Sequence, residues 1–259
     1  MNTRRLATTG AALVALGLGA TGCNQTGTGT PSASGSASAG ASTSASPAGL
    51  APGEALNELT AAAFKLNEQS VRVAIESGAL KGGGLMDPPA KTADLTLSLG
   101  TAGQLRLLMD HSDGYLKVTG QPNAPQKWLH LDSATLGQGQ LNLMPDGDPG
   151  GANRMLKNVA DVQRTGGNTY AGTIDLTKAG DKNTAALGEK AKAIPFTATK
   201  DDQGRLTELT IDMSGIQVAL GKVKTSYSDF GTAVSVQKPT AAETQEASPE
   251  LLKAFGVTA

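Results

Sequence analysis

Aliphatic side chains alternate with polar ones along much of the chain after residue 70, and this period of two constrains the fold more than any other feature. Leucines occupy every second position from Leu95 to Leu99, and apolar residues return at the same spacing from Leu105 to Met109. Side chains two residues apart point to the same face of a strand, so each run predicts a strand with one apolar face. The Asp-Gly pair at 113–114, which follows the second run, tolerates the positive φ of a hairpin turn. The pattern therefore predicts an antiparallel meander that buries one face.

The same periodicity predicts about ten strands, with few and short helices between them. A segment rich in glycine and proline, Gly82–Pro89, is expected to be a loop, and the segment between Ser133 and Val159 an irregular crossing. Helices are expected at 52–68, 154–159, 177–191 and 248–255. The expected strands are 71–76, 94–99, 105–109, 116–118, 128–131, one at Val162, 170–176, 194–199, 206–213, 218–227 and 234–236.

A sheet of this size cannot leave its apolar face in water, so it must curl on itself or be capped by helices. The chain holds only four Phe, three Tyr and one Trp, and its apolar mass is mainly Leu, Val and Ala. Aliphatic side chains must therefore line the interior. Such an interior can be filled by side chains or left hollow, and the scarcity of aromatic rings favours a hollow.

The first 22 residues have the three regions of a bacterial lipoprotein export signal. Arg4 and Arg5 precede a short uncharged apolar run, small residues follow, and Cys23, the one cysteine of the chain, comes directly after Gly22. This end resembles a lipobox, usually Leu-Ala/Ser-Gly/Ala-Cys, with Ala20 in place of the commonest leucine. A lone cysteine has no disulfide partner within the chain, so we expect it to carry a lipid anchor on the extracytoplasmic face of the cell membrane. Sec and twin-arginine export both stay open.

Residues 23–50 are expected to form the lipidated cysteine and a disordered tether, followed by one domain at 51–259. Gly, Ala, Ser, Thr and Pro make up 24 of the 27 residues at 24–50, and none of the 27 is charged or aromatic. Such a segment buries too little apolar area to offset its conformational entropy. Its mean span is about 30 Å. After removal of the signal the chain has 20 basic and 23 acidic residues, and this near-neutral balance argues against nucleic acid as a partner.

Neither catalysis nor a metal or cofactor site is expected. Asp110–Asp113 contains the residue types of a serine triad, but neighbours on one turn cannot converge as nucleophile, base and orienter. His111 is expected to be a solvated turn residue. Asp146–Gly150 imitates the start of a calcium loop, yet its fifth position is glycine and Lys157 stands where a bidentate glutamate is needed. Two isolated histidines and one cysteine make no zinc set, and the glycines at 82–84 lack the lysine of a phosphate loop.

Two pairs of segments make the sequence similar to a known family. Tyr115–Val118 with Lys127–Asp132, and Tyr227–Gly231 with Val234–Val236 and Pro239, resemble the actinobacterial LppX/LprG lipoproteins. Those belong to the wider LolA/LolB-like group of periplasmic lipid and lipoprotein carriers. The resemblance implies an α+β fold in which a strongly curved antiparallel sheet, a half-barrel, has a few helices over its concave face and an apolar cavity for acyl chains.

The function implied by this resemblance is non-enzymatic. We expect a membrane-anchored lipoprotein that binds an acylated lipid or glycolipid and carries or presents it at the cell envelope, with an envelope transporter or acceptor protein as partner. The alternative is a surface module of the same fold that has a solid core and binds a protein through the segments 82–89 and 146–151. The candidate cavity residues, each of which could instead belong to an ordinary packed core, are Val71, Val73, Ile75, Leu95, Leu97, Leu99, Leu105, Leu107, Met109, Leu116 and Val118.

Overall fold

The computed structural model describes residues 52–122, 124–132, 147–179, 188–249 and 252. The chain divides into two compact units, Met1–Ser44 and Ala45–Ala259, and every described residue belongs to the second. That unit has its own hydrophobic core, which is the property of a domain able to fold alone. The expected export signal, Cys23 and the tether lie outside the described residues.

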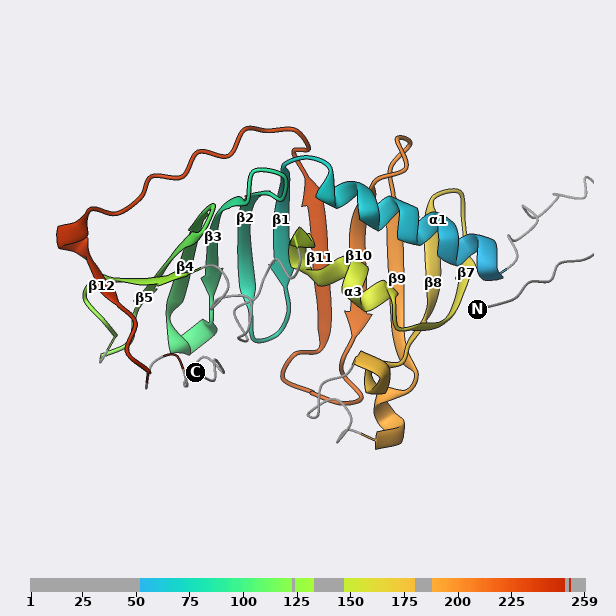
Figure 1. Cartoon of the computed structure of the whole chain (residues 1–259). Helices are drawn as coiled ribbons and strands as arrows, with labels where there is room; N and C mark the ends of the chain where they lie inside the picture. The colour runs from blue at the N-terminus through green and yellow to red at the C-terminus, as the bar shows by residue number, and fades with distance from the viewer. Residues whose placement is uncertain (1–51, 123, 133–146, 180–187, 250–251, 253–259) are drawn as a thin grey trace, which may run out of the picture. The chain divides into compact units, whose positions relative to one another are not determined.

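Twelve strands of the described residues form one sheet, in the order β12-β6-β5-β4-β3-β2-β1-β11-β10-β9-β8-β7 (Figure 1). Every neighbouring pair is antiparallel except β12 and β6, which are parallel. The expected α+β fold with a strongly curved sheet is confirmed, with twelve strands in place of about ten. The strands are β1 (Val71–Glu76), β2 (Lys81–Asp87), β3 (Thr92–Ser98), β4 (Gln104–Asp110), β5 (Asp113–Thr119), β6 (Trp128–Asp132), β7 (Val159–Arg164), β8 (Thr169–Ile174), β9 (Ile194–Lys200), β10 (Leu206–Asp212), β11 (Lys222–Ser228) and β12 (Thr244–Glu246).

The pairing register places the apolar side chains of successive strands on one face of the sheet. Val73 lies opposite Gly84, Gly84 opposite Leu95, and Leu95 opposite Leu107. Residues directly opposite each other point to the same side, so the alternation within each strand adds up to one surface, here called the apolar face. Its members are Val71, Val73, Ile75, Met86, Ala93, Leu95, Leu97, Leu105, Leu107, Met109, Leu116, Val118, Leu129, Leu131, Val162, Tyr170, Ile174, Ile194, Phe196, Ala198, Leu209, Ile211 and Tyr227.

Helix α1 (Pro52–Phe64) covers part of the apolar face because its own apolar side chains recur at helical spacing. Ala55, Leu59 and Ala63 are fully buried, and so is Leu66 in the 3-10 turn η1 (Lys65–Asn67) that follows. The helix packs on β7, β9 and β10 and on a second short helix, α3 (Ala152–Leu156). Figure 1 shows α1 running across this part of the sheet.

A polar cluster fixes α1 to the sheet. The Tyr170 hydroxyl on β8 donates a hydrogen bond to the Glu58 carboxylate on α1, and Lys200 on β9 lies 3.0 Å from the same oxygen. Arg164 on β7 lies 4.0 Å from it. The hydrogen bond from Tyr170, followed by the one from Lys200, lowers the pKa of Glu58. One carboxylate therefore ties the helix to three neighbouring strands.

The predicted loop Gly82–Pro89 is wrong, because most of it forms β2 in the middle of the sheet. A Cβ atom on Gly83 would lie 1.9 Å from the Val73 carbonyl oxygen, and one on Gly84 would lie 1.9 Å from that of Asp94. Only glycine fits where neighbouring backbones approach this closely, which outweighs its poor strand propensity. The connection to β3 shrinks to residues 88–91.

A strap, residues 229–243, leads from β11 to β12, which pairs with the edge of β6 (Figure 1). Gly231 donates its N–H to the Ser70 carbonyl at 2.8 Å. The Lys238 ammonium lies 2.8 Å from Asp110 and 3.0 Å from Asp113, both at the β4–β5 turn. The strap is therefore held at both of its ends and near its middle.

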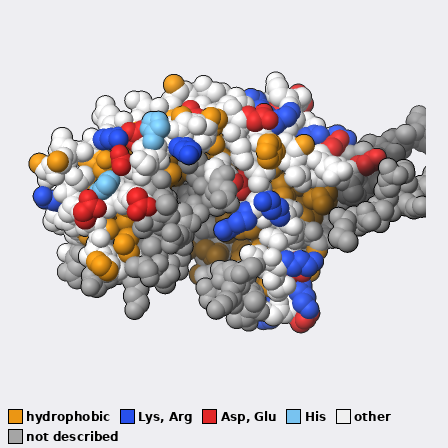
Figure 2. All heavy atoms as spheres, in the orientation of Figure 1, with side chains coloured by type: hydrophobic (Ala, Val, Ile, Leu, Met, Phe, Trp, Pro, Cys, Tyr) orange, Lys and Arg blue, Asp and Glu red, His pale blue; other side chains and the backbone are white. Residues whose placement is uncertain are grey.

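His130 on β6 joins β12 to the same acidic turn. Its Nδ1 lies 2.9 Å from Glu246 on β12, and its Nε2 lies 3.4 Å from Asp113. The hydrogen bond to Glu246 raises the pKa of His130 most, and that to Asp113 adds to it. Figure 2 shows histidine side chains, in pale blue, on the left of the view beside acidic and basic ones.

Two further sequence predictions differ from the structure. No strand forms at 234–236, because both edges of β11 are already occupied by β1 and β10 and the chain must leave the sheet there. The strand predicted over 218–227 begins only at Lys222, because residues 213–221 form a hydrogen-bonded turn. Of the helix predicted at 177–191, the described ends are the 3-10 turns η5 (Leu176–Ala179) and η6 (Gly188–Ala191). Most of the helix predicted at 248–255 lies outside the described residues.

We predict that Gly84→Ala lowers the free energy of unfolding by about 2 kcal/mol or more, because the new methyl group meets backbone that cannot move aside. Gly53→Ala is the matched control, since a Cβ there meets nothing within 4 Å. Gly53 lies in the first turn of α1, so its replacement should change the free energy of unfolding by less than about 0.5 kcal/mol. Urea unfolding midpoints measure both, and equal small effects would contradict the close backbone approach.

We also predict a pH-dependent role for His130. Since its pKa is raised above the ordinary 6.5, its contribution to stability is fully present below that pH and is lost as pH rises through the folded-state pKa. His130→Gln should therefore cost about 0.5–1 kcal/mol at a pH of about 6 and less at about 8.5. Glu246→Gln is the matched variant, because it removes the carboxylate that raises the pKa of His130 most and should lose the same pH-dependent stability. A cost for His130→Gln that does not change with pH would instead point to lost packing on Tyr115, whose ring centroid lies 5.2 Å away.

Candidate functional site

The residues predicted to line a cavity lie together on the apolar face, with one exception. Ten of the eleven are on β1, β3, β4 and β5 and share this face. Leu99 follows the end of β3, where it is partly buried and packs against the core. Ile75, Met109 and Val118 are also partly buried, near the ends of their strands, and the other seven are at most 4% exposed. That any of them contacts lipid stays a prediction.

Sequence reasoning left several members of the face out of that candidate set. Leu129 and Leu131 continue it onto β6, and their alternation was a sufficient signal. Met86 lies in the segment expected to be a loop, so its place on the face could not be read from the pattern. The members on β7–β11 required the pairing of strands far apart in sequence, since β1 pairs with β11.

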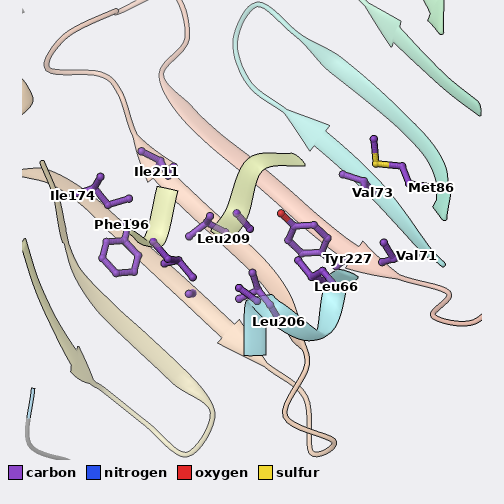
Figure 3. Packing of buried hydrophobic residues seen from close by; sticks show 14 of the residues in the cluster. Leu66, Val71, Val73, Met86, Ile174, Phe196, Leu206, Leu209, Ile211 and Tyr227 are labelled. Atoms are coloured by element: carbon purple, nitrogen blue, oxygen red, sulfur yellow. The ribbon is translucent and has the colours of Figure 1, made fainter. Parts of the chain in front are cut away.

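The apolar face divides by chemistry into two halves on either side of β1. The half on β2–β6, here called the aliphatic half, contains only Met, Ala, Leu and Val side chains. The half on β7–β11, here called the aromatic half, contains Tyr170, Phe196 and Tyr227 among aliphatic residues. Figure 3 shows Phe196 and Tyr227 among the leucines and isoleucines of that half.

The aromatic half is a fixed packing surface. α1 packs on β7, β9 and β10, and the 3-10 turn η4 (Pro149–Gly151) packs on β1. The Tyr227 hydroxyl donates to the Pro149 carbonyl at 3.3 Å, and burial raises the pKa of Tyr227. Tyr170 is tied to α1 through Glu58. Aromatic rings held by hydrogen bonds cannot adapt to a flexible chain, so this half serves the core.

The aliphatic half has the opposite properties. Its side chains offer no hydrogen-bonding groups, and Leu and Met have several rotamers of similar energy. Gly82 and Gly84 add no side chain to the face between Ile75 and Leu97 and between Val73 and Leu95. A chemically uniform surface of this kind can contact hydrocarbon without selecting a shape.

The polar sites considered in the sequence have structural explanations. Asp148, in the segment that imitates a calcium loop, accepts backbone N–H groups from Asn153 at 3.1 Å and from Arg154 at 2.9 Å. Burial raises its pKa, and these hydrogen bonds oppose the rise. The carboxylate therefore caps the first turn of α3 by accepting two of its backbone N–H groups. Among the described residues, no three His, Cys, Asp or Glu side chains are placed to hold a metal ion.

The two segments expected to bind a protein partner in the alternative function are not exposed loops. Residues 81–87 are a strand within the sheet, and Asp148, Pro149 and Gly151 are buried. At the β4–β5 turn, His111 pairs with Asp110 at 2.6 Å and lies with Ser112 around a surface pocket of about 450 Å³.

No family model and no curated protein matches the chain. Among solved structures, the chain is similar to the lipoprotein LppX of Mycobacterium tuberculosis, with 17% sequence identity over 72% of this chain and all of that one, and a TM-score of 0.48. These values are too low to transfer a ligand or site residues from one protein to the other. Within the described part of the chain, no helix has the length and apolar character needed to cross a bilayer.

Proposed function

We propose that this protein is a membrane-anchored extracytoplasmic lipoprotein whose domain binds an acylated lipid on the aliphatic half and carries or presents it at the cell envelope. The observation that carries this proposal is the segregation of side chains on the apolar face. Aromatic and hydrogen-bonded residues gather under α1 and η4, whereas the side chains that β2–β6 contribute to this face are all aliphatic.

The energetics of acyl chains fit such a surface. A hydrocarbon chain leaves a membrane at little net cost only if the protein offers comparable apolar area, at about 25 cal/mol per Å² removed from water. Leucine and methionine side chains provide that area and can change rotamer as chains of different length enter. Bond-making residues are not needed for this function, and we infer no catalysis.

The anchor supports the same proposal from the other end of the chain. A lipid on Cys23 and a tether with a mean span of about 30 Å would keep the domain within reach of the membrane that supplies its ligand. A carrier held in this way must deliver the lipid nearby. We therefore include an envelope transporter or acceptor protein among its partners.

The first test examines the domain, residues 45–259, expressed in a bacterium without Cys23 and purified without detergent. Native mass spectrometry should detect the protein with co-purified lipid of defined mass. Lipid added to the stripped protein should raise its melting temperature. A lipid-free mass together with an unchanged melting temperature would favour the alternative, a solid-cored module that binds a protein.

A pair of substitutions locates the site. Leu107→Trp on the aliphatic half should abolish lipid binding and leave the lipid-free protein about as stable as before, because the added ring occupies space otherwise taken by ligand. Leu209→Trp on the aromatic half is the matched control, since Leu107 is 2% and Leu209 3% exposed. There the ring overpacks a filled core and should cost about 1–3 kcal/mol. Equal destabilisation by both substitutions would mean that the two halves are packed alike.

A further inference from the structure

Three connections between strands lie at the same end of the sheet and contain no charged residue and no histidine. They are Ser77–Leu80 between β1 and β2, Leu99–Gly103 between β3 and β4, and Met213–Gly221 between β10 and β11. Because β3, β2, β1, β11 and β10 are consecutive in the sheet, the three connections follow one another across the ends of these strands. We call them the uncharged lip.

The opposite end of the same strands is charged. The β2–β3 connection contains Lys91, and the β9–β10 connection contains Asp201, Asp202 and Arg205. The strap adds Lys238 beside the β4–β5 turn at that end. At the lip's own end, Glu76, Lys81, Asp212 and Lys222 directly flank two of the connections. Further charges lie in the β8–β9 connection and at Lys127 before β6. The lack of charge is therefore a local property of the lip.

The lip contains apolar side chains both at its surface and against the core. Val218 is 85% exposed, and Ala219 next to it in sequence is also exposed, as are Ala79 and Ala102 in the other two connections. One layer deeper, the partly buried residues that pack against the core are Leu80, Leu99, Met213 and Ile216. A hydrocarbon chain at the lip would therefore find apolar side chains at the surface and others in contact with the core.

The exposure of Val218 is built into the fold. The Met213 carbonyl accepts the N–H groups of Ile216 and Gln217 at 2.9 and 2.8 Å, and the Gln217 carbonyl accepts that of Leu220 at 2.9 Å. Gly78 donates its N–H to the Leu220 carbonyl at 2.9 Å, which joins the two central connections. A turn held by these bonds keeps Val218 at its tip, where it cannot fold back onto the core.

Charges at the base of the lip are balanced. Lys81 pairs with Glu76 at 2.6 Å, and Lys224 pairs with Glu208 at 2.6 Å. Lys222 lies opposite Asp212 in the β10–β11 register. Equal numbers of acids and bases around an apolar tip match the layering of a zwitterionic bilayer, where mixed charges lie above hydrocarbon. They offer no single-sign field that would select an acidic or basic protein.

We propose that the uncharged lip docks on a lipid bilayer, with Val218 inserted among the headgroups, and that lipid enters and leaves the domain across it. This inference deepens the proposed function and rests on it for the identity of the cargo. Docking on a bilayer can be measured without bound lipid. An experiment can therefore contradict the docking inference without contradicting the proposed lipid binding, and the reverse.

The docking test uses the domain, residues 45–259, which forms one compact unit with its own core. In a Trp128→Phe background, which removes the single tryptophan, Val218→Trp places a fluorophore at the lip. Its emission should shift to shorter wavelength on adding phosphatidylcholine vesicles. Phe64→Trp is the matched control, because Phe64 is also exposed, at 60%, but lies near the opposite end of β1. No shift at position 218, or an equal shift at position 64, would overturn the proposal.

The transfer test separates docking from lipid binding. Val218→Glu should keep co-purified lipid, as measured by native mass spectrometry, but deliver it to vesicles about tenfold more slowly, since the transfer free energy of one valine side chain corresponds to about that factor. Phe64→Glu should deliver at the rate of the unchanged domain. Lipid loss in Val218→Glu would place position 218 in the binding site and contradict a docking role.

Sedimentation tests whether the lip instead joins two copies of the domain. If the unchanged domain is a dimer and Val218→Glu dissociates it, the lip serves self-association, and the proposal is overturned.

Discussion

The rest of the structure depends on one constraint, the need to remove from water the apolar face of a twelve-stranded sheet. Every strand but β12 contributes at least one side chain to that face, and the register keeps them on the same side. A slip of one residue in any pair would turn the apolar side chains of a strand outward, so register and burial enforce each other. Gly83 and Gly84 contribute to the same burial, because β2 fits between β1 and β3 only where these residues add no Cβ atom.

The two halves of the face meet this constraint differently. On the aromatic half, α1 brings its own apolar stripe and the Glu58 carboxylate, which accepts hydrogen bonds from β8 and β9 and lies 4.0 Å from Arg164 on β7. Tyr227 donates a hydrogen bond to η4. The energy of these hydrogen bonds depends on direction, so one arrangement of the side chains and the helix has a lower free energy than others. On the aliphatic half the side chains have no such bonds, and burial alone sets their free energy. A surface without directional preferences is the one that can exchange its contacts with hydrocarbon, which is why the proposed lipid site lies there.

The two ends of the sheet also differ, in the charge of the connections between their strands. Ion pairs of the strap with the β4–β5 turn, and His130 between Glu246 and Asp113, gather charge at and near one end. The lip at the other end exposes Val218 on a turn held by backbone hydrogen bonds. A domain with a charged turn at one end and an uncharged lip with an exposed valine at the other has a preferred orientation at an interface between water and lipid, and an anchor at Cys23 would supply that interface.

The sequence by itself determined the strands with clear alternation, the one-sided burial and the helix before β1, because these depend on local periodicity and propensity. It placed ten of eleven candidate residues on one face for the same reason. It failed at β2, where three glycines indicate a loop until the neighbouring backbones are known, and at 234–236, where a strand-like pattern has no free edge to join. Only the tertiary structure decided that β1 pairs with β11, and hence that the face has an aromatic and an aliphatic half. That pairing joins segments about 150 residues apart through backbone hydrogen bonds that leave no mark on local composition.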